Sequence, residues 1–324
     1  MDSMTQQISY WSPLERGYER MRRMLFEPFD LVKWLVLGFA AWLASLGSGP
    51  GGGGNVSGDP TEIGSSVGDA ASSAFSSILA LSIASFVIVA VLLLVAVVLW
   101  ISSRGKFIYL DNVVHDRAEI VKPWRDFRKL GDSLFLWRLI FVAIVIAVIG
   151  AAVVIPALPA AIVTGGDLDD LSYFAITSWG VLVGIVAVFV AIASIFVALF
   201  LDAFIVPIMY RFNLGAVEGW RYFIPWLKAR PGSFLLYGLF VLLLAIAYVI
   251  ISLLVCVLTC CIGALPYVGT VLLLPLLVTY RCFSLEWLAQ LDPGFDVFTP
   301  LPGQEVVEDQ SQNEINEELD GEKS

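Results

Sequence analysis

Long apolar stretches alternate with shorter polar segments along this chain. A helix needs about 20 apolar residues to cross a hydrocarbon core about 30 Å thick. Inside a bilayer it also satisfies its own backbone hydrogen bonds. The pattern predicts an all-α integral membrane protein with about six transmembrane helices, at residues 31–47, 78–101, 134–155, 178–200, 234–262 and 266–283.

The first predicted span has an alternative interpretation as a cleaved signal peptide, with a small-residue cleavage site near Ala41 to Ala44. A signal peptide begins with a short basic region. The polar segment before this span is long and contains Glu15, Glu19 and Glu27. We therefore expect the first helix to be retained.

Lysine and arginine are distributed on one side of the predicted spans. None occurs in the segments 48–77, 156–177 and 263–265, which alternate with the basic ones. Cytoplasmic loops retain positive charge during insertion. We therefore expect a multi-pass protein of a bacterial cytoplasmic (inner) membrane, with the N and C termini in the cytoplasm.

Composition supports a membrane protein, because the 324 residues are 58% hydrophobic and only 15% charged, against about 25% charged in soluble domains. The net charge of −10 comes largely from the C-terminal end. The predicted organisation is an N-terminal amphipathic segment at 1–30, a membrane domain at 31–292 and an acidic, disordered cytoplasmic tail at 293–324. The membrane domain has a Gly/Ser-rich outer loop at 48–77 and basic connectors at 104–133 and 203–233.

The two basic connectors resemble each other. KPWRDFRKLGDSLFLWRLIF at 122–141 and IPWLKARPGSFLLYGLF at 224–240 both run from Pro-Trp through basic residues to an apolar helix. The likeness suggests hairpin repeats of the same orientation, related about the membrane normal. Chance similarity between two basic loops is the alternative.

Three stretches carry a resemblance to a known group: RGKFIYLDNVV, KPWRDF and LDAFIVPIMYRFNLGAVEGWRYF. They resemble uncharacterised bacterial multi-pass membrane proteins, which are similar to the membrane domain attached to some glycerophosphodiester phosphodiesterases. The resemblance covers roughly residues 10–295 and implies a helical bundle without catalytic residues. The phosphodiesterase activity of the fused proteins belongs to a separate soluble barrel, for which this chain has no room.

The stretch HDRAEIVKPWRDFRKLGD at 115–132 contains the only histidine, His115, within a cluster of acidic and basic residues. A catalytic site needs partners for general acid-base chemistry, and this stretch offers a lone histidine. Basic and aromatic residues interleaved with apolar ones are instead typical of a membrane interface. We therefore expect His115 to be a bystander and lipid-surface contacts from Arg117, Lys122, Trp124, Arg125, Arg128 and Lys129.

Asp202, in VALFLDAFIVPIMYRF, is the strongest single candidate for a functional residue. Ionisable groups inside a bilayer are costly and usually serve a purpose. The apolar run from Tyr173 to Tyr210 is too long for one span, which favours an interfacial Asp202 followed by a bend at Pro207. An intramembrane position is the alternative.

These patterns favour a membrane protein that is not an enzyme and has no cofactor or metal. Its role would be membrane organisation or binding of a partner. The cysteines Cys256, Cys260 and Cys261 are expected to be packing residues. Expected partners are the bilayer, its anionic headgroups and a soluble protein that binds the acidic tail, but no nucleic acid. A transporter or channel subunit is the alternative, supported by Asp202 and possible helix breaks at Pro156, Pro159 and Pro275; a lipid-processing enzyme comes third.

Overall fold

The computed structural model describes residues 9–46, 74–163, 173–259 and 262–298, and these segments are helical. In chain order the α-helices are α1 (Trp11–Phe26), α2 (Leu31–Ser45), α4 (Ala74–Val114), α5 (Val121–Asp126), α6 (Arg128–Val163), α7 (Tyr173–Phe200), α8 (Val206–Phe212), α9 (Ala216–Ala229), α10 (Pro231–Leu258), α11 (Pro266–Leu272) and α12 (Leu274–Ala289). Short turns of other helix types are η2 (Leu201–Ile205), η3 (Ile262–Ala264) and η4 (Pro293–Phe295).

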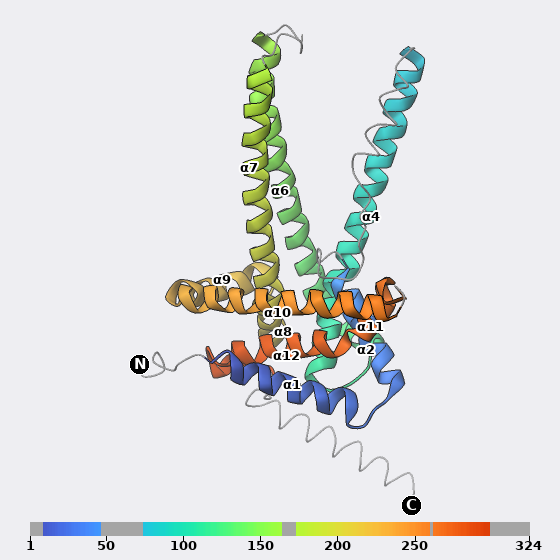
Figure 1. Cartoon of the computed structure of the whole chain (residues 1–324), viewed down its shortest axis with the longest axis vertical. Coiled ribbons are helices and arrows are strands. Elements are labelled where there is room, and N and C mark those ends of the chain that lie inside the picture. The colour runs from blue at the N-terminus through green and yellow to red at the C-terminus, as the bar shows by residue number, and fades with distance from the viewer. Residues whose placement is uncertain (1–8, 47–73, 164–172, 260–261, 299–324) are drawn as a thin grey trace, which may run out of the picture.

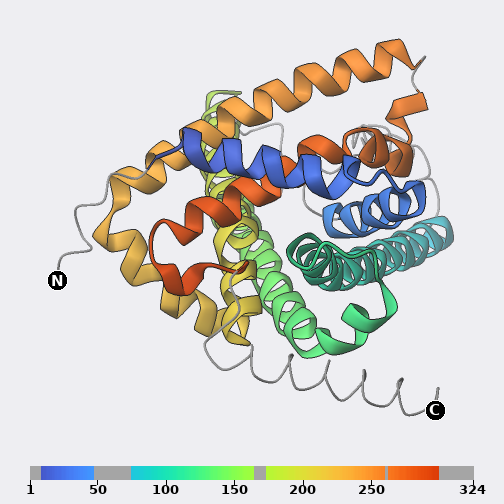
Figure 2. The ribbon, with the colours of Figure 1, turned by 90° about the horizontal axis from the view of Figure 1, so that it is seen from below.

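The long helices fall into two sets of different direction. In Figure 1, α4, α6 and α7 stand upright, whereas α1, α9, α10 and α12 lie across their lower ends. Seen from below, α10 runs along one edge of this transverse layer, with α1 and α12 nearby (Figure 2). The upper parts of the upright helices expose large apolar side chains such as Phe86, Leu93 and Phe189.

Four helical segments of the described chain are long and apolar enough to cross a membrane: Ser85–Val114, Arg128–Ile155, Trp179–Phe212 and Pro231–Leu258. They correspond to the second to fifth predicted spans. The first predicted span is the shorter apolar helix α2. The sixth is divided at Leu273 into α11 and α12, and α12 carries Arg281 and Glu286. Six spans are therefore not confirmed.

The predicted hairpin repeat would place α4 and α6 in the same arrangement as α7 and α10. Figure 1 shows α4 and α6 both upright, whereas α10 runs across the lower end of α7. The two pairs of helices are thus arranged differently. The Pro-Trp likeness of their connectors is not matched by a likeness of the hairpins in this structure.

Helix α1 is an amphipathic helix that lies against α12. The two backbones approach so closely at Gly17 that a Cβ there would lie 2.9 Å from the amide nitrogen of Phe283. The contact also buries Glu286, which pairs with Arg16 at 3.0 Å and with Arg20 at 2.8 Å. The α1 part of the predicted N-terminal segment, Trp11–Phe26, therefore belongs to the folded layer.

An aromatic core joins the upright helix α7 to the transverse layer. The fully buried ring of Phe204 lies 5.2 Å from Phe223, 4.8 Å from Tyr237 and 5.4 Å from Trp287, measured between ring centroids. These partners belong to α9, α10 and α12. Aromatic side chains contribute large buried areas and form favourable stacked and tilted contacts, so Phe204 holds the layer at this end of α7.

The packed part extends slightly beyond the predicted boundary at residue 292. Phe295 is buried and its ring contacts Trp226, with 5.5 Å between centroids. Residues 293–298 of the predicted tail therefore belong to the folded part, and residues 299–324 lie outside the described residues. Most of the predicted outer loop at 48–77 lies outside them as well.

Candidate functional site: a basic cavity at a π-helical turn

Asp202 lies in a π-helical turn, η2, between α7 and α8. The N–H of Val206 bonds to the carbonyl of Leu201, five residues earlier. Pro207 has no N–H to donate. Together these two features leave the carbonyls of Asp202 and Ala203 without their usual helical partner. Such turns occur frequently at functional sites.

Helix α12 supplies the missing donors. Arg281 Nη1 donates to the carbonyl of Asp202 at 2.5 Å. Ser284 Oγ donates to the carbonyl of Ala203 at 3.0 Å. The hydroxyl of Tyr237 on α10 in turn donates to Ser284 Oγ at 3.2 Å. The irregular turn therefore fixes α12, and through it α10, to the lower end of α7.

These contacts correct the expectation of a bend at Pro207. The helix continues through Pro207 to Phe212, and the chain turns at Asn213, which has the left-handed conformation (φ 52°). Asparagine tolerates this conformation better than most residues. Asp202 consequently lies inside the apolar helical segment Trp179–Phe212.

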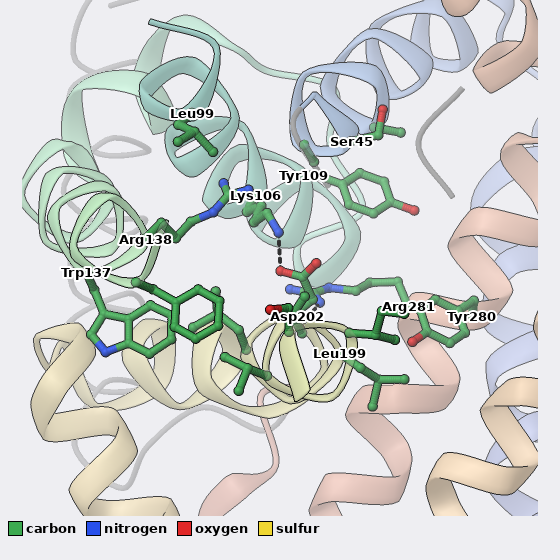
Figure 3. A pocket seen from close by; sticks show the side chains of 18 of the residues that line it. Ser45, Leu99, Lys106, Tyr109, Trp137, Arg138, Leu199, Asp202, Tyr280 and Arg281 are labelled. Carbon is green, nitrogen blue, oxygen red and sulfur yellow. Dashed lines mark hydrogen bonds and ion pairs between the residues drawn. The ribbon is translucent and has the colours of Figure 1, made fainter. Parts of the chain in front are cut away.

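The Asp202 carboxylate faces a cavity of about 650 Å³ that is bounded by α2, α4, α6, α7, η2 and α12. Figure 3 shows the Lys106 side chain pointing at this carboxylate and Arg281 reaching toward it from α12. Lys106 forms a hydrogen-bonded ion pair with Asp202. The Lys106 side chain is only 7% exposed, whereas that of Asp202 is 34% exposed. The pair therefore lies at the cavity wall, with its acid toward the open space.

A third basic side chain, Arg138 of α6, lines the same cavity. Its Nη1 donates to Ser102 Oγ at 3.1 Å and to Ser103 Oγ at 3.3 Å. Lys106, Arg138 and Arg281 are all buried. Three basic groups and one acidic group thus share one cavity.

The remaining walls of the cavity are mainly apolar. They include Trp137 and Phe141 of α6 and a stretch of α7 from Ser194 to Leu199. Ile195 in that stretch is 63% exposed, so the wall continues into the outward apolar surface of α7. One side of the cavity is therefore apolar, and the other is formed by Lys106, Arg138, Arg281 and Asp202. We call the three basic residues of this side the charged floor.

A second polar cluster lies where α4 meets the connector. Asp111 is almost fully buried and accepts hydrogen bonds from Arg117 Nη2 at 2.7 Å and from the hydroxyl of Tyr210 at 2.8 Å. His115 Nδ1 lies 3.1 Å from an Asp111 oxygen. The hydrogen bond to Asp111 raises the pKa of His115 above its ordinary value. His115 therefore belongs to a structural network that fixes the connector.

The predicted lipid-contact residues fall into two groups. Two of them make internal contacts. Arg117 forms an ion pair with Asp111, and Trp124 packs edge-on against Trp100, with 6.0 Å between ring centroids. The others are exposed on α5 and the first turn of α6: Lys122, Arg125, Arg128 and Lys129. Within the described part of the chain, their side chains make no ion pair. We call these four residues the connector bases.

Sequence reasoning did not identify Lys106, Arg138 and Arg281 as site residues, because it used the basic residues only to predict the orientation of the spans. A signal was present for two of them, since Arg138 lies between Trp137 and Leu139 in LWRLIF and Arg281 lies between Tyr280 and Cys282 in TYRCF. Lys106 follows Gly105 in RGKFIYL and carried no such signal. Among the described residues, no group of three His, Cys, Asp or Glu side chains could hold a metal ion. Cys260 and Cys261 lie outside those residues.

The comparisons with known proteins give one match. A model of a family of unknown function, DUF7544, matches residues 12–295. No curated protein and no solved structure matches the chain. The match shows no link to the membrane domain attached to glycerophosphodiester phosphodiesterases.

Proposed function

The chain belongs to this family of unknown function, and we propose that it is a non-enzymatic integral membrane protein that organises anionic lipid around its basic connector. It would lie in the cytoplasmic membrane, with both termini and the connector in the cytoplasm.

The observation that carries this proposal is the exposure of the connector bases. They lie within eight residues, directly after the apolar segment Ser85–Val114 and at the start of Arg128–Ile155. Each Lys or Arg close to an anionic membrane surface contributes about 1 kcal/mol of binding free energy. Four such groups without internal ion pairs are enough for a stable preference for anionic headgroups.

A transporter or channel subunit is a second candidate, supported by the charged cavity around Asp202. Ionisable groups within apolar helices commonly mark a substrate or ion pathway. A lipid-processing enzyme would need a nucleophile or a general base placed beside a reacting group. The Asp202 carboxylate, the acid of the cavity that could act as a base, is paired with Lys106, which favours binding over chemistry.

The proposal can be tested with the full chain reconstituted in vesicles that mix phosphatidylglycerol and phosphatidylcholine. Extraction in a neutral detergent at low salt gives the ratio of the two lipids that co-purify. We expect enrichment of phosphatidylglycerol that falls about tenfold in the variant Arg125→Gln/Arg128→Gln, from two lost contributions of about 1 kcal/mol each, reduced by partial compensation. Added salt should produce the same loss, because exposed charges are screened.

A matched control is the variant Arg22→Gln/Arg23→Gln on α1. These arginines are also exposed but lie close to acids of the same segment, with Arg22 at 2.9 Å from Glu27 and Arg23 at 3.9 Å from Glu19. Enrichment should survive this change. If both variants lose the enrichment of phosphatidylglycerol equally, the enrichment depends on net charge and not on the connector bases. If either lipid is chemically converted during incubation, the protein is an enzyme and the proposal is wrong.

A further inference from the structure

The cavity around Asp202 contains more positive charge than its own acid can neutralise. Lys106, Arg138 and Arg281 contribute three positive charges and Asp202 one negative charge, which leaves a net charge of +2 among these four groups. Buried charge is costly unless it is paired. A ligand that brings negative charge into the cavity would therefore be favoured.

The same cavity has hydrogen-bond donors that lack acceptors. Arg281 Nε and the hydroxyl of Tyr109 are buried and have no partner among the described residues, and both side chains are only 8% exposed. A buried donor without an acceptor costs free energy. A guanidinium group in particular fits the oxygens of a phosphate. The donors and the excess charge point to the same kind of ligand, an oxyanion.

The apolar wall restricts the ligand further. Trp137, Phe141 and the α7 residues Ile195 and Ala198 line the space beside the charged floor, and Ile195 and Ala198 are exposed. This wall belongs to the candidate membrane span Trp179–Phe212, whose outward surface would face lipid chains. A soluble anion has no group to place along such a surface, whereas an anion attached to an apolar chain could lay its chain along α7 and place its charge in the cavity. A volume of about 650 Å³ lies in the range of small-molecule sites, about 300–1,000 Å³.

We propose that this cavity is a specific site for one anionic phospholipid, whose phosphate lies on the Lys106, Arg138 and Arg281 floor and whose chain follows the outward wall of α7. The site is separate from the connector bases and does not depend on the proposed function. It differs from the connector surface by binding a single lipid in a fixed orientation.

The test uses the purified full chain in a neutral detergent, with the connector variant Arg125→Gln/Arg128→Gln as background. High salt, about 1 M, screens the remaining exposed charges. Native mass spectrometry then counts bound lipid at matched concentrations of phosphatidylglycerol and phosphatidylcholine with identical chains. We expect one phosphatidylglycerol to be retained, with an affinity about tenfold or more above that of phosphatidylcholine, because the buried floor is screened much less than the surface.

Two tryptophan variants on α7 locate the bound lipid without touching the charges. Ala198 lines the cavity, so Ala198→Trp should fill the path of the chain and reduce phosphatidylglycerol binding about tenfold or more. Ala193 is also exposed on α7 but lies on another face of the helix, and Ala193→Trp should leave binding unchanged. Equal loss in the two variants, or no loss in Ala198→Trp, would overturn the site.

Two further measurements examine the charge and the source of the phosphate. Asp202→Asn should increase the thermal stabilisation given by phosphatidylglycerol, since it removes the competing negative charge; an unchanged or smaller stabilisation would contradict the assignment of the floor. Glycerol phosphate serves as the water-soluble comparison, because it carries a phosphate without apolar chains. If it stabilises the protein as much as phosphatidylglycerol at the same concentration, the ligand is a soluble phosphate and the lipid assignment is wrong.

Discussion

The buried basic groups around Asp202 and the exposed connector bases are chemically alike but have opposite surroundings. Lys106, Arg138 and Arg281 are buried among helices and share one acid. Lys122 and Arg128, in contrast, are exposed on α5 and the start of α6. Removing the partner of a buried charge costs several kcal/mol, whereas an exposed charge contributes little to folding. The first group should therefore determine stability and the second should determine contact with the membrane.

The largest expected effect follows from replacing the shared acid. Asp202→Asn leaves the buried Lys106 ammonium without its ion-pair partner and should destabilise the protein by about 3 kcal/mol. The measurement is denaturant or thermal unfolding of the full chain in detergent, followed by circular dichroism. Removing both charges, in Lys106→Gln/Asp202→Asn, should recover part of this loss.

The control is a pair in which both side chains are exposed. Arg22 is 63% exposed and Glu27 is 52% exposed, with 2.9 Å between Nη2 and Oε1. Glu27→Gln should cost much less stability than Asp202→Asn, because water can replace the lost contact. If the two substitutions destabilise equally, burial does not distinguish the two regions and the comparison fails.

A smaller effect is expected from Ser284→Ala at the π-helical turn. The substitution leaves the carbonyl of Ala203 without a donor and should cost about 2 kcal/mol. The additional substitution Pro207→Ala provides a backbone N–H that can donate to the carbonyl of Ala203, because alanine has the N–H that proline lacks. The double variant should then regain part of the stability, measured by the same unfolding experiment. Identical losses in the single and double variants would show that Ser284 acts through packing alone.

The sequence predicted one of these regions better than the other. The connector bases could be recognised because their basic and aromatic pattern is local, and the long apolar runs gave α4, α6, α7 and α10. The charged cavity depends on α4, α6, α7 and α12 meeting in space, so its members are separated by up to 175 positions, from Lys106 to Arg281. Asp202 was identified only because it interrupts an apolar run.

The directions of the helices could not be predicted from the sequence either. Hydropathy identifies α10 as long enough to span a membrane, yet α10 lies across the upright helices in Figure 1. Its position follows from tertiary contacts, since Phe234 and Tyr237 enter the aromatic core around Phe204. The division of the sixth predicted span likewise places α12 where Arg281 and Ser284 meet the π-helical turn.

The smallest expected effect concerns His115, which belongs to the network around Asp111. Its side chain is 44% exposed and its partner Asp111 is buried. The hydrogen bond to Asp111 raises the pKa of His115 above 6.5, so the protonated imidazole stabilises the fold. This contribution is complete below the unfolded pKa and is lost as the pH rises through the folded value. His115→Ala should therefore destabilise the protein at acidic pH by no more than about 0.5 kcal/mol after solvent screening.

At alkaline pH the His115→Ala variant and the original chain should unfold at the same point, which a pH series of thermal unfolding curves can check. Arg117→Gln is the control, because Arg117 also pairs with Asp111, at 2.7 Å, but stays charged across the whole range. The loss of stability caused by Arg117→Gln should therefore persist at alkaline pH. A loss from His115→Ala that does not fade with rising pH would mean that the imidazole acts through packing and that its charge is irrelevant. A large loss of a cellular phenotype in a folded His115→Ala protein would instead revive a catalytic role for this histidine, since the network around Asp111 predicts only a minor structural one.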